Sequence, residues 1–220
     1  LAAAFESETH RVFLLKSNPE FPRLIVMEPL VSEYRDEITL LNSLYPLAAA
    51  KPNARYVGEV FAALDQLEVR RILESHSIRF NYHHETKNPL ITDSAFVLSF
   101  PSDYSGNRIG YCQVDLDDVD ALGLGTPIQL PNEVLSQLDL VDEFSRRHRL
   151  DPLVMGLDHM ATRALAGERE DAILEFLTMS NYYFWGAYNI ADMNSSTNVN
   201  RNSNVEDDKR SPAKVFTANN

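Results

Sequence analysis

One histidine inside a short apolar run is the first residue of this chain that could take part in chemistry. His159 stands in GLDHMATR (156–163), ahead of a helix-period segment at 169–179 and an apolar run at 182–190. A strand that opens a βαβ unit can fix an imidazole while further ligands arrive from other strands of the same half-barrel, so this pattern indicates a metal site. The alternative for a single strand histidine is a hydrogen-bonded core or surface residue.

An earlier part of the chain repeats the element order found around His159. The first copy is predicted as one helix, beginning at Asp65, and four strands, at 55–61, 78–82, 95–100 and 108–114. The second copy is predicted as strand 154–164, helix 169–179, strand 182–190 and strand 214–218. Its segment 191–204 is rich in Asn and Ser, which composition assigns to a loop or to disorder, so this copy is expected to be incomplete at the C-terminus.

The predicted fold class is therefore α+β, with two βαβββ modules that form half-open curved sheets. We expect an N-terminal, structural module at 1–122, which also contains strands at 9–15 and 23–27, a linker with a helix at 123–152, and the start of a metal-binding module at 153–220. The sequence begins and stops within structure-like segments, so the expectation is a fragment.

Composition limits the classes of partner. The net charge of -12 argues against nucleic acid or an anionic membrane surface, because both need basic protein surface.

The single cysteine, Cys112, excludes an internal disulfide framework and is predicted to be a small buried residue in a strand. No apolar run approaches the roughly 18 residues of a membrane span, so a soluble, cytoplasmic protein is expected. The sequence has no Gly-rich phosphate loop and no nucleophile elbow, which leaves nucleotide-binding and serine hydrolase readings without support.

Two other groups of residues contain histidines and glutamates, which are residue types that can bind a metal. His83, His84 and Glu85 follow a predicted strand, with His76 upstream, but adjacent strand residues point to opposite faces, so a polar loop is the preferred interpretation. His10 lies near Glu8 and would be a ligand only if the first module were catalytic.

Three further clusters have a structural and a functional interpretation. The acidic run 115–120 lacks the glycine and terminal glutamate of a calcium loop and is predicted to be a solvated loop. The basic end of the helix at 133–149 suits the negative pole of the helix dipole better than a phosphate site. The aromatic cluster on the strand from 182 would serve core packing or, alternatively, line an aromatic substrate; its members are Tyr182, Tyr183, Phe184, Trp185 and Tyr188.

The segment 56–114 resembles the vicinal oxygen chelate superfamily, which includes glyoxalases, bleomycin-resistance proteins and dioxygenases. The likeness rests on LEVRRILESHSIRF (67–80) and on the turn SDYSGNR (102–108), which is similar to the frequent DPDGNR turn of that superfamily. Within it, GLDHMATR after a helical linker and a closing KVFTANN (214–220) most resemble the 4-hydroxyphenylpyruvate dioxygenase family. The resemblance implies paired βαβββ modules around a divalent metal.

Carried over residue by residue, the resemblance makes His159 the first iron ligand and Asn219 a substrate-facing residue, with Asn200 as a second substrate-binding candidate. The remaining His and Glu ligands would lie beyond Asn220. Asp158 is expected to point away from His159 and therefore not to orient it. The run 198–202 is more polar than the family's strand, and Asn220 stands where that family has an acid, so both put the substrate identity in question.

The resemblance implies a non-haem Fe(II) dioxygenase of aromatic amino acid catabolism, acting on an aromatic 2-oxo acid, although another divalent metal would fit the scaffold. Two alternatives stay open: a metal-dependent lyase or isomerase on the same scaffold, and a non-catalytic module that binds a small molecule. The expected partner is a small-molecule substrate, homo-oligomerisation is left open, and no catalytic residue besides the metal ligand is predicted.

Overall fold

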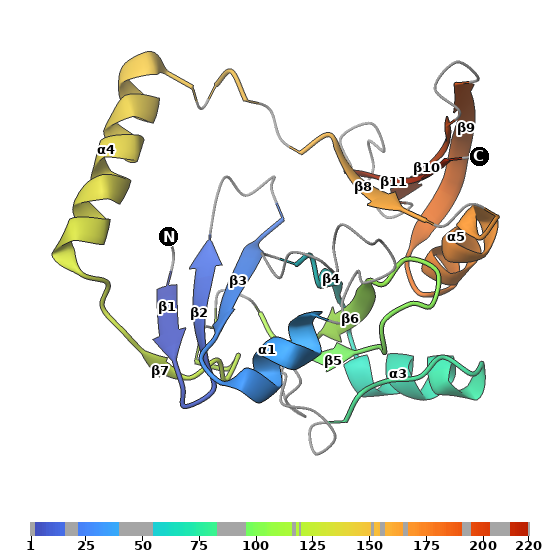
Figure 1. The fold of residues 1–220 in the computed structure, drawn as a ribbon, viewed down its shortest axis with the longest axis horizontal. Coiled ribbons are helices and arrows are strands. Elements are labelled where there is room, and N and C mark those ends of the chain that lie inside the picture. Colours follow the sequence, from blue (N-terminus) through green and yellow to red (C-terminus); the bar gives the residue numbers. More distant parts are fainter. Residues whose placement is uncertain are drawn as a thin grey trace. The chain divides into compact units, whose positions relative to one another are not determined.

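The computed structural model contains two compact units, each described here by itself (Figure 1). The described residues are 3–15, 22–39, 55–82, 96–115, 118, 120–150, 152–154, 157–164, 167–190, 195–202 and 212–219. The first unit is made of Leu1–Leu30 and Leu124–Leu157, and the second of Val31–Gly123 and Asp158–Asn220. Within the described residues, no helix combines the length and the apolar character that crossing a membrane requires.

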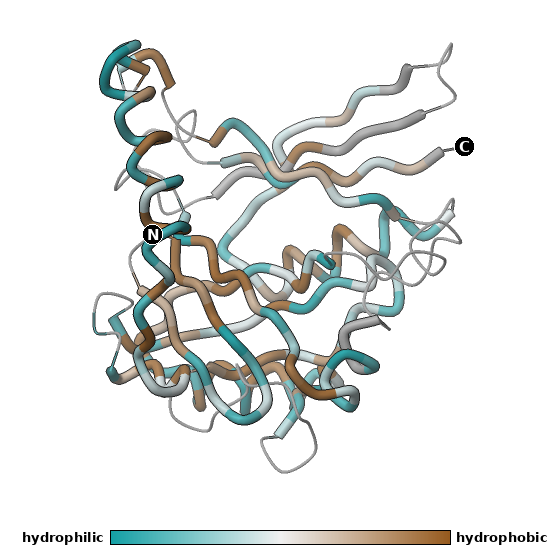
Figure 2. Tube along the Cα trace, turned by 60° about the vertical axis from the view of Figure 1, so that its left-hand side comes forward, coloured by the Kyte–Doolittle hydropathy of each residue, from teal (hydrophilic) through white to brown (hydrophobic). Residues whose placement is uncertain are grey.

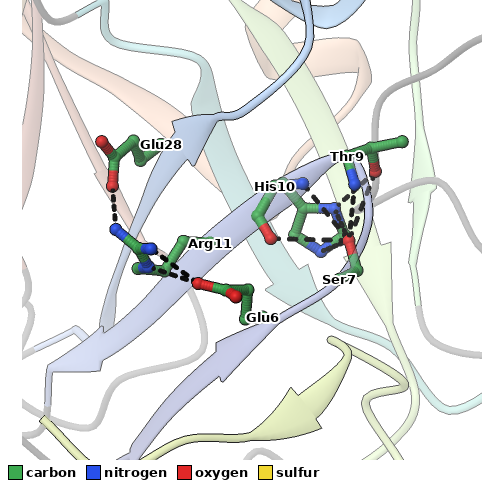
Figure 3. Close-up of polar contacts among 6 residues, drawn as sticks. All are labelled: Glu6, Ser7, Thr9, His10, Arg11 and Glu28. Atoms are coloured by element: carbon green, nitrogen blue, oxygen red, sulfur yellow. Dashed lines mark hydrogen bonds and ion pairs between the residues drawn. The ribbon is translucent and has the colours of Figure 1, made fainter.

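The first unit holds an antiparallel sheet and one long helix. The strands follow the order β3-β2-β1-β7, with β1 at Ala3–Glu6, β2 at His10–Leu15, β3 at Leu24–Pro29 and β7 at Thr126–Pro127. Along β2 the residues alternate between buried and half-buried, so His10, Val12 and Leu14 share the inner face. On the other face, Arg11 forms ion pairs with Glu6 and Glu28 (Figure 3).

Helix α4 spans Asn132–His148 and carries no buried residue. Hydrophobic residues (brown) and hydrophilic residues (teal) alternate along it in Figure 2. Its last turn contains Arg146, Arg147 and His148, and Arg149 closes the helix in a left-handed conformation with φ 52°. This placement agrees with the prediction that the basic cluster complements the helix dipole.

The second unit contains the first copy of the predicted repeat, preceded by helix α1 (Ser32–Thr39). Strand β4 (Gly58–Ala62) is followed by helix α3 (Gln66–Ser75), an isolated antiparallel bridge between Phe80 and Ser99, strand β5 (Val97–Leu98) and strand β6 (Arg108–Cys112). The sheet order is β4-β6-β5, with β4 parallel to β6 and β5 antiparallel to it.

The second copy follows the same order and the same pairing. It consists of β8 (His159–Arg163), α5 (Arg169–Thr178), β9 (Tyr182–Ile190), β10 (Ser195–Asn202) and β11 (Ala213–Asn219), and its sheet has the order β8-β11-β10-β9. In both copies the first strand is parallel to the last, and the last is antiparallel to the one before it. The α+β fold class and the repeated βαβββ order are thus present in the structure.

The prediction of a loop or disorder at 191–204 is wrong, because Ser195–Asn202 forms strand β10. Its backbone pairs with β9 on one side and β11 on the other, and ladder hydrogen bonds form whatever the polarity of the side chains. The second copy therefore has all four strands, so the expectation that it is incomplete is corrected too. Strands β1 and β7 were not predicted, and β8 begins at His159, later than the predicted start at 154.

Both copies contribute to one hydrophobic core in the second unit. The rings of Phe61 and Tyr182 lie 6.3 Å and 5.2 Å from that of Phe176, measured between centroids, and Phe216 lies 5.6 Å from the same ring. The buried members of this core are Leu73, Phe80, Val97, Ile109, Tyr111, Ala164, Ala172, Ile173, Phe176, Met179 and Phe216. The Tyr111 hydroxyl donates to the Met179 carbonyl, and burial raises the pKa of that tyrosine.

Candidate functional site

His159 is the first residue of β8 and lies on the sheet face opposite helix α5. Thr162 is buried, whereas His159, Ala161 and Arg163 are exposed, as the alternation of a strand with one covered face requires. The His159 side chain is 54% exposed, so the imidazole is open to solvent.

Asp158 contacts the ring of His159, contrary to the prediction that it points away, although its own side chain is 95% exposed. Its Oδ2 atom lies 2.6 Å from Nδ1 of His159. Asp158 precedes the strand, so the alternation of faces within β8 does not apply to it. A carboxylate that accepts a hydrogen bond from Nδ1–H favours the ring form whose Nε2 lone pair is available, and histidine binds a metal in this form.

His159 fits a divalent metal as one ligand, but the described part of the chain does not complete a site. Among the described residues, no group of three or more His, Cys, Asp or Glu side chains could hold a metal ion. The expectation that further ligands lie beyond Asn220 stays a prediction.

The two asparagines predicted to face the substrate lie in strands, and their side chains are outside the described set. Asn200 of β10 pairs with Lys214 of β11, next to Ala213, which pairs with His159. Asn219 pairs with Ser195. It lies six residues after Ala213 along β11, which is about 20 Å at the usual rise of a strand. The backbone of Asn200 therefore lies near the end of the sheet that contains His159, and the backbone of Asn219 lies at the other end.

Both ring nitrogens of His10 are already used in the first unit, and Figure 3 shows the contacts with Ser7 and Thr9. Nδ1 lies 2.7 Å from the Ser7 hydroxyl and 2.9 Å from the Thr9 hydroxyl, and Nε2 lies 3.0 Å from the Leu124 carbonyl oxygen. Burial lowers the pKa of this imidazole, which is partly offset by the hydrogen bond to Leu124. The ring therefore links the turn at Ser7 and Thr9 to Leu124 and has no nitrogen left for a metal.

The other candidate groups give a mixed result. His76 is exposed at the end of α3, with Nδ1 3.0 Å from the Ile72 carbonyl, while His83, His84 and Glu85 lie outside the described residues. Cys112 is buried in β6 as predicted, and burial raises the pKa of its thiol. Of the run 115–120, residues 116, 117 and 119 are outside the described set.

The aromatic residues of β9 differ in their surroundings, and the substrate-lining role stays a prediction. Tyr182 packs against Phe176, as the core interpretation requires. Tyr188 is 53% exposed, and its register partner Thr197 pairs with Thr217, which in turn pairs with Arg163. Residues paired in this way share a face, so Tyr188 lies on the same open face of the sheet as His159.

Sequence reasoning missed a buried charge pair and a cavity in the second unit. Lys214 of β11 donates to Glu59 of β4, and the two side chains are 2% and 9% exposed. Both line a cavity of about 110 Å³. In the sequence Lys214 is one residue of the strand-like run KVFTANN, and no spacing relates it to Glu59.

Comparisons with known proteins were made by family, by sequence and by structure. No protein-family model matches the chain, and no curated protein matches it. A crystal structure of a glyoxalase I mutant from Zea mays is similar over 96% of this chain and 55% of that one, with 10% identity and a TM-score of 0.32. The chain thus spans about half the length of that enzyme. A likeness this weak does not establish a shared family, and the resemblance to 4-hydroxyphenylpyruvate dioxygenase stays a prediction.

Proposed function

We propose that the chain is part of a metal-dependent enzyme, a non-haem Fe(II) dioxygenase that acts on an aromatic 2-oxo acid, with His159 as one metal ligand. The repeated βαβββ order supports a scaffold of the vicinal oxygen chelate type. The observation that carries the proposal is the 2.6 Å contact between the exposed side chains of Asp158 and His159, because a carboxylate hydrogen-bonded to Nδ1 favours the ring form whose Nε2 can bind a metal.

Each residue of this proposal has a defined task. His159 would bind the metal through Nε2, and Asp158 would hold the proton on Nδ1 and fix the ring orientation. Fe(II), when bound by two imidazoles and one carboxylate, supplies open coordination positions for a 2-oxo acid and O₂.

Metal binding is the first test. His159→Gln in the full-length gene product is expected to abolish tight binding of Co(II), followed by its visible absorption, while His148→Gln in the exposed last turn of α4 leaves it unchanged. Asp158→Asn keeps the ligand but weakens its support, and we expect affinity to fall roughly 10- to 100-fold. Wild-type affinity in the His159→Gln variant contradicts the assignment of His159.

The reaction is tested separately from the metal. Oxygen uptake by the Fe(II)-loaded full-length protein with 4-hydroxyphenylpyruvate or phenylpyruvate is expected to exceed that of the His159→Gln variant. Bound iron without any uptake overturns the dioxygenase assignment. Turnover that persists without O₂ and with Mg²⁺ or Mn²⁺ identifies the lyase or isomerase alternative instead.

A further inference from the structure

Helix α4 of the first unit has an apolar face that is open to solvent. At 3.6 residues per turn, Val134, Leu138 and Val141 lie on one side of the helix, and Leu140 and Phe144 lie beside them. The exposed fractions of Leu140, Val141 and Phe144 are 65%, 65% and 58%, and no residue of the helix is buried. Because an amphipathic helix is stabilised mainly by the packing of its apolar face, this face is expected to have a partner.

Two opposite charges stand at the two ends of this face. Glu133 lies in the first turn and Arg147 in the last, and both are exposed. Glu133 is seven residues before Leu140, and Arg147 is seven residues after it. Seven residues make two turns in helices that pair with one another, so the three side chains form one row along an edge of the apolar face.

This row is complementary to a second copy of itself in the antiparallel orientation. When two such helices are related by a twofold axis at Leu140, Glu133 of each faces the partner's Arg147, and the two leucines meet at the centre. In a parallel pair the two acidic ends would meet, as would the two basic ends, and like charges repel. The helix dipoles also favour the antiparallel pair, because each N-terminus then lies beside a C-terminus.

We propose that α4 packs against α4 of a second copy of this chain, antiparallel about a twofold axis at Leu140, with an ion pair between Glu133 and Arg147 at each end. A helix of 17 residues is about 25 Å long and offers a small interface, so the dimer is expected to form reversibly. None of these residues belongs to the metal site proposed above, so the two proposals can fail independently.

Sedimentation velocity of the full chain over a range of protein concentrations tests the dimer. The wild type is expected to shift from monomer to dimer as the concentration rises. Leu140→Lys places two ammonium groups against each other at the axis and is expected to weaken the dimer at least about tenfold. Leu174→Lys in α5 is the matched control, because Leu174 is 63% exposed and lies outside the proposed interface, and it should leave the dimer unchanged.

Charge reversals test the antiparallel orientation. Glu133→Arg faces the partner's Arg147, and Arg147→Glu faces the partner's Glu133, so each variant alone is expected to dimerise more weakly than the wild type. An equal mixture of the two variants is complementary again and is expected to form a heterodimer. Asp139→Arg, an exposed substitution on the opposite side of α4, makes the same change of charge as Glu133→Arg and should have no effect on the dimer.

Three results would overturn the proposal. A wild-type protein that stays monomeric at every concentration has no such dimer, and a thermal transition lowered more by Leu140→Lys than by Leu174→Lys would then show that the face packs within its own chain. A dimer that Leu140→Lys leaves unchanged has its interface elsewhere. Charge-reversal variants that do not form a heterodimer when mixed exclude the antiparallel pairing of Glu133 with Arg147.

Discussion

Lys214 donates a hydrogen bond to Glu59 across 155 residues of sequence, and this pair joins the two copies of the repeat inside their common core. The rings of Tyr56, Phe176 and Phe216 lie between 5.5 Å and 5.8 Å from the Lys214 ammonium. Two charges removed from water are tolerated only while both are present, because either one alone would be buried without compensation.

A double-mutant cycle tests this pair. Lys214→Met or Glu59→Leu alone is expected to lower the free energy of unfolding by about 3–5 kcal/mol, since each leaves one buried charge. The double variant is expected to recover most of that loss. Urea unfolding followed by the fluorescence of Trp185 measures all three.

The exposed pair Arg71–Glu68 provides the control for this cycle. Its atoms lie 2.6 Å apart, yet water screens them, and Arg71→Met is expected to cost less than about 1 kcal/mol. Single variants of the buried pair that cost no more than Arg71→Met would show that burial adds nothing to the Lys214–Glu59 interaction.

Asp65 caps helix α3, and its removal should destabilise the second unit. Its Oδ1 accepts from the backbone N–H groups of Leu67 and Glu68 at 3.0 Å and 2.9 Å. Asp65→Ala leaves both donors unpaired and is expected to cost about 1 kcal/mol of unfolding free energy. Asp139→Ala, inside exposed α4, is the matched control and should be close to neutral. Equal effects of the two substitutions would contradict the capping role.

Local signals predicted the elements that local interactions stabilise. Helix α3 follows from the Asp65 cap and the apolar spacing of Leu67, Val69, Ile72 and Leu73, and the observed bounds lie within a residue or two of those expected. Strand β10 could not be predicted, because its stability comes from strands on both sides rather than from its own Asn- and Ser-rich side chains.

The candidate site shows the same limit. The apolar neighbours of His159 predict that it lies in a strand. The contact between Asp158 and His159 could not be predicted, because side chains alternate between the two faces only within a strand and Asp158 lies one residue before β8. The cavity depends on segments from both copies that meet only after folding. No spacing in the sequence relates Asn107 to Glu175 or to Lys214.

Gly58 is required where β4 meets β6. Its φ is +152°, and a Cβ added there would lie 1.8 Å from the backbone oxygen of Arg108, an atom that the sheet holds in place. Gly58→Ala is therefore expected to cost well over 1 kcal/mol or to prevent folding. Gly186→Ala in β9 meets nothing within 4 Å and should change stability by less than about 1 kcal/mol. Thermal unfolding compares them, and a Gly58→Ala protein as stable as Gly186→Ala would refute the clash.

His10 makes the stability of the first unit depend on pH. In the folded chain the neutral ring donates from Nε2 to the Leu124 carbonyl and accepts at Nδ1 from the hydroxyls of Ser7 and Thr9. Burial lowers its pKa below the ordinary value of 6.5, so the folded state binds the proton less readily than the unfolded state. The stabilisation is therefore fully present above pH 6.5 and is lost as the pH falls through 6.5 towards the folded pKa.

His10→Gln removes this titration and isolates it from all other groups. The difference in unfolding free energy between wild type and His10→Gln is expected to be largest at pH 7.5 and to shrink towards pH 5, with a slope of at most about 1.4 kcal/mol per pH unit. Gln137→Asn, an exposed substitution in α4 that involves no titratable group, should show a difference that is nearly constant over the same range. Urea unfolding at several pH values measures both, and a His10→Gln difference that grows on acidification would mean that the folded state favours the protonated ring.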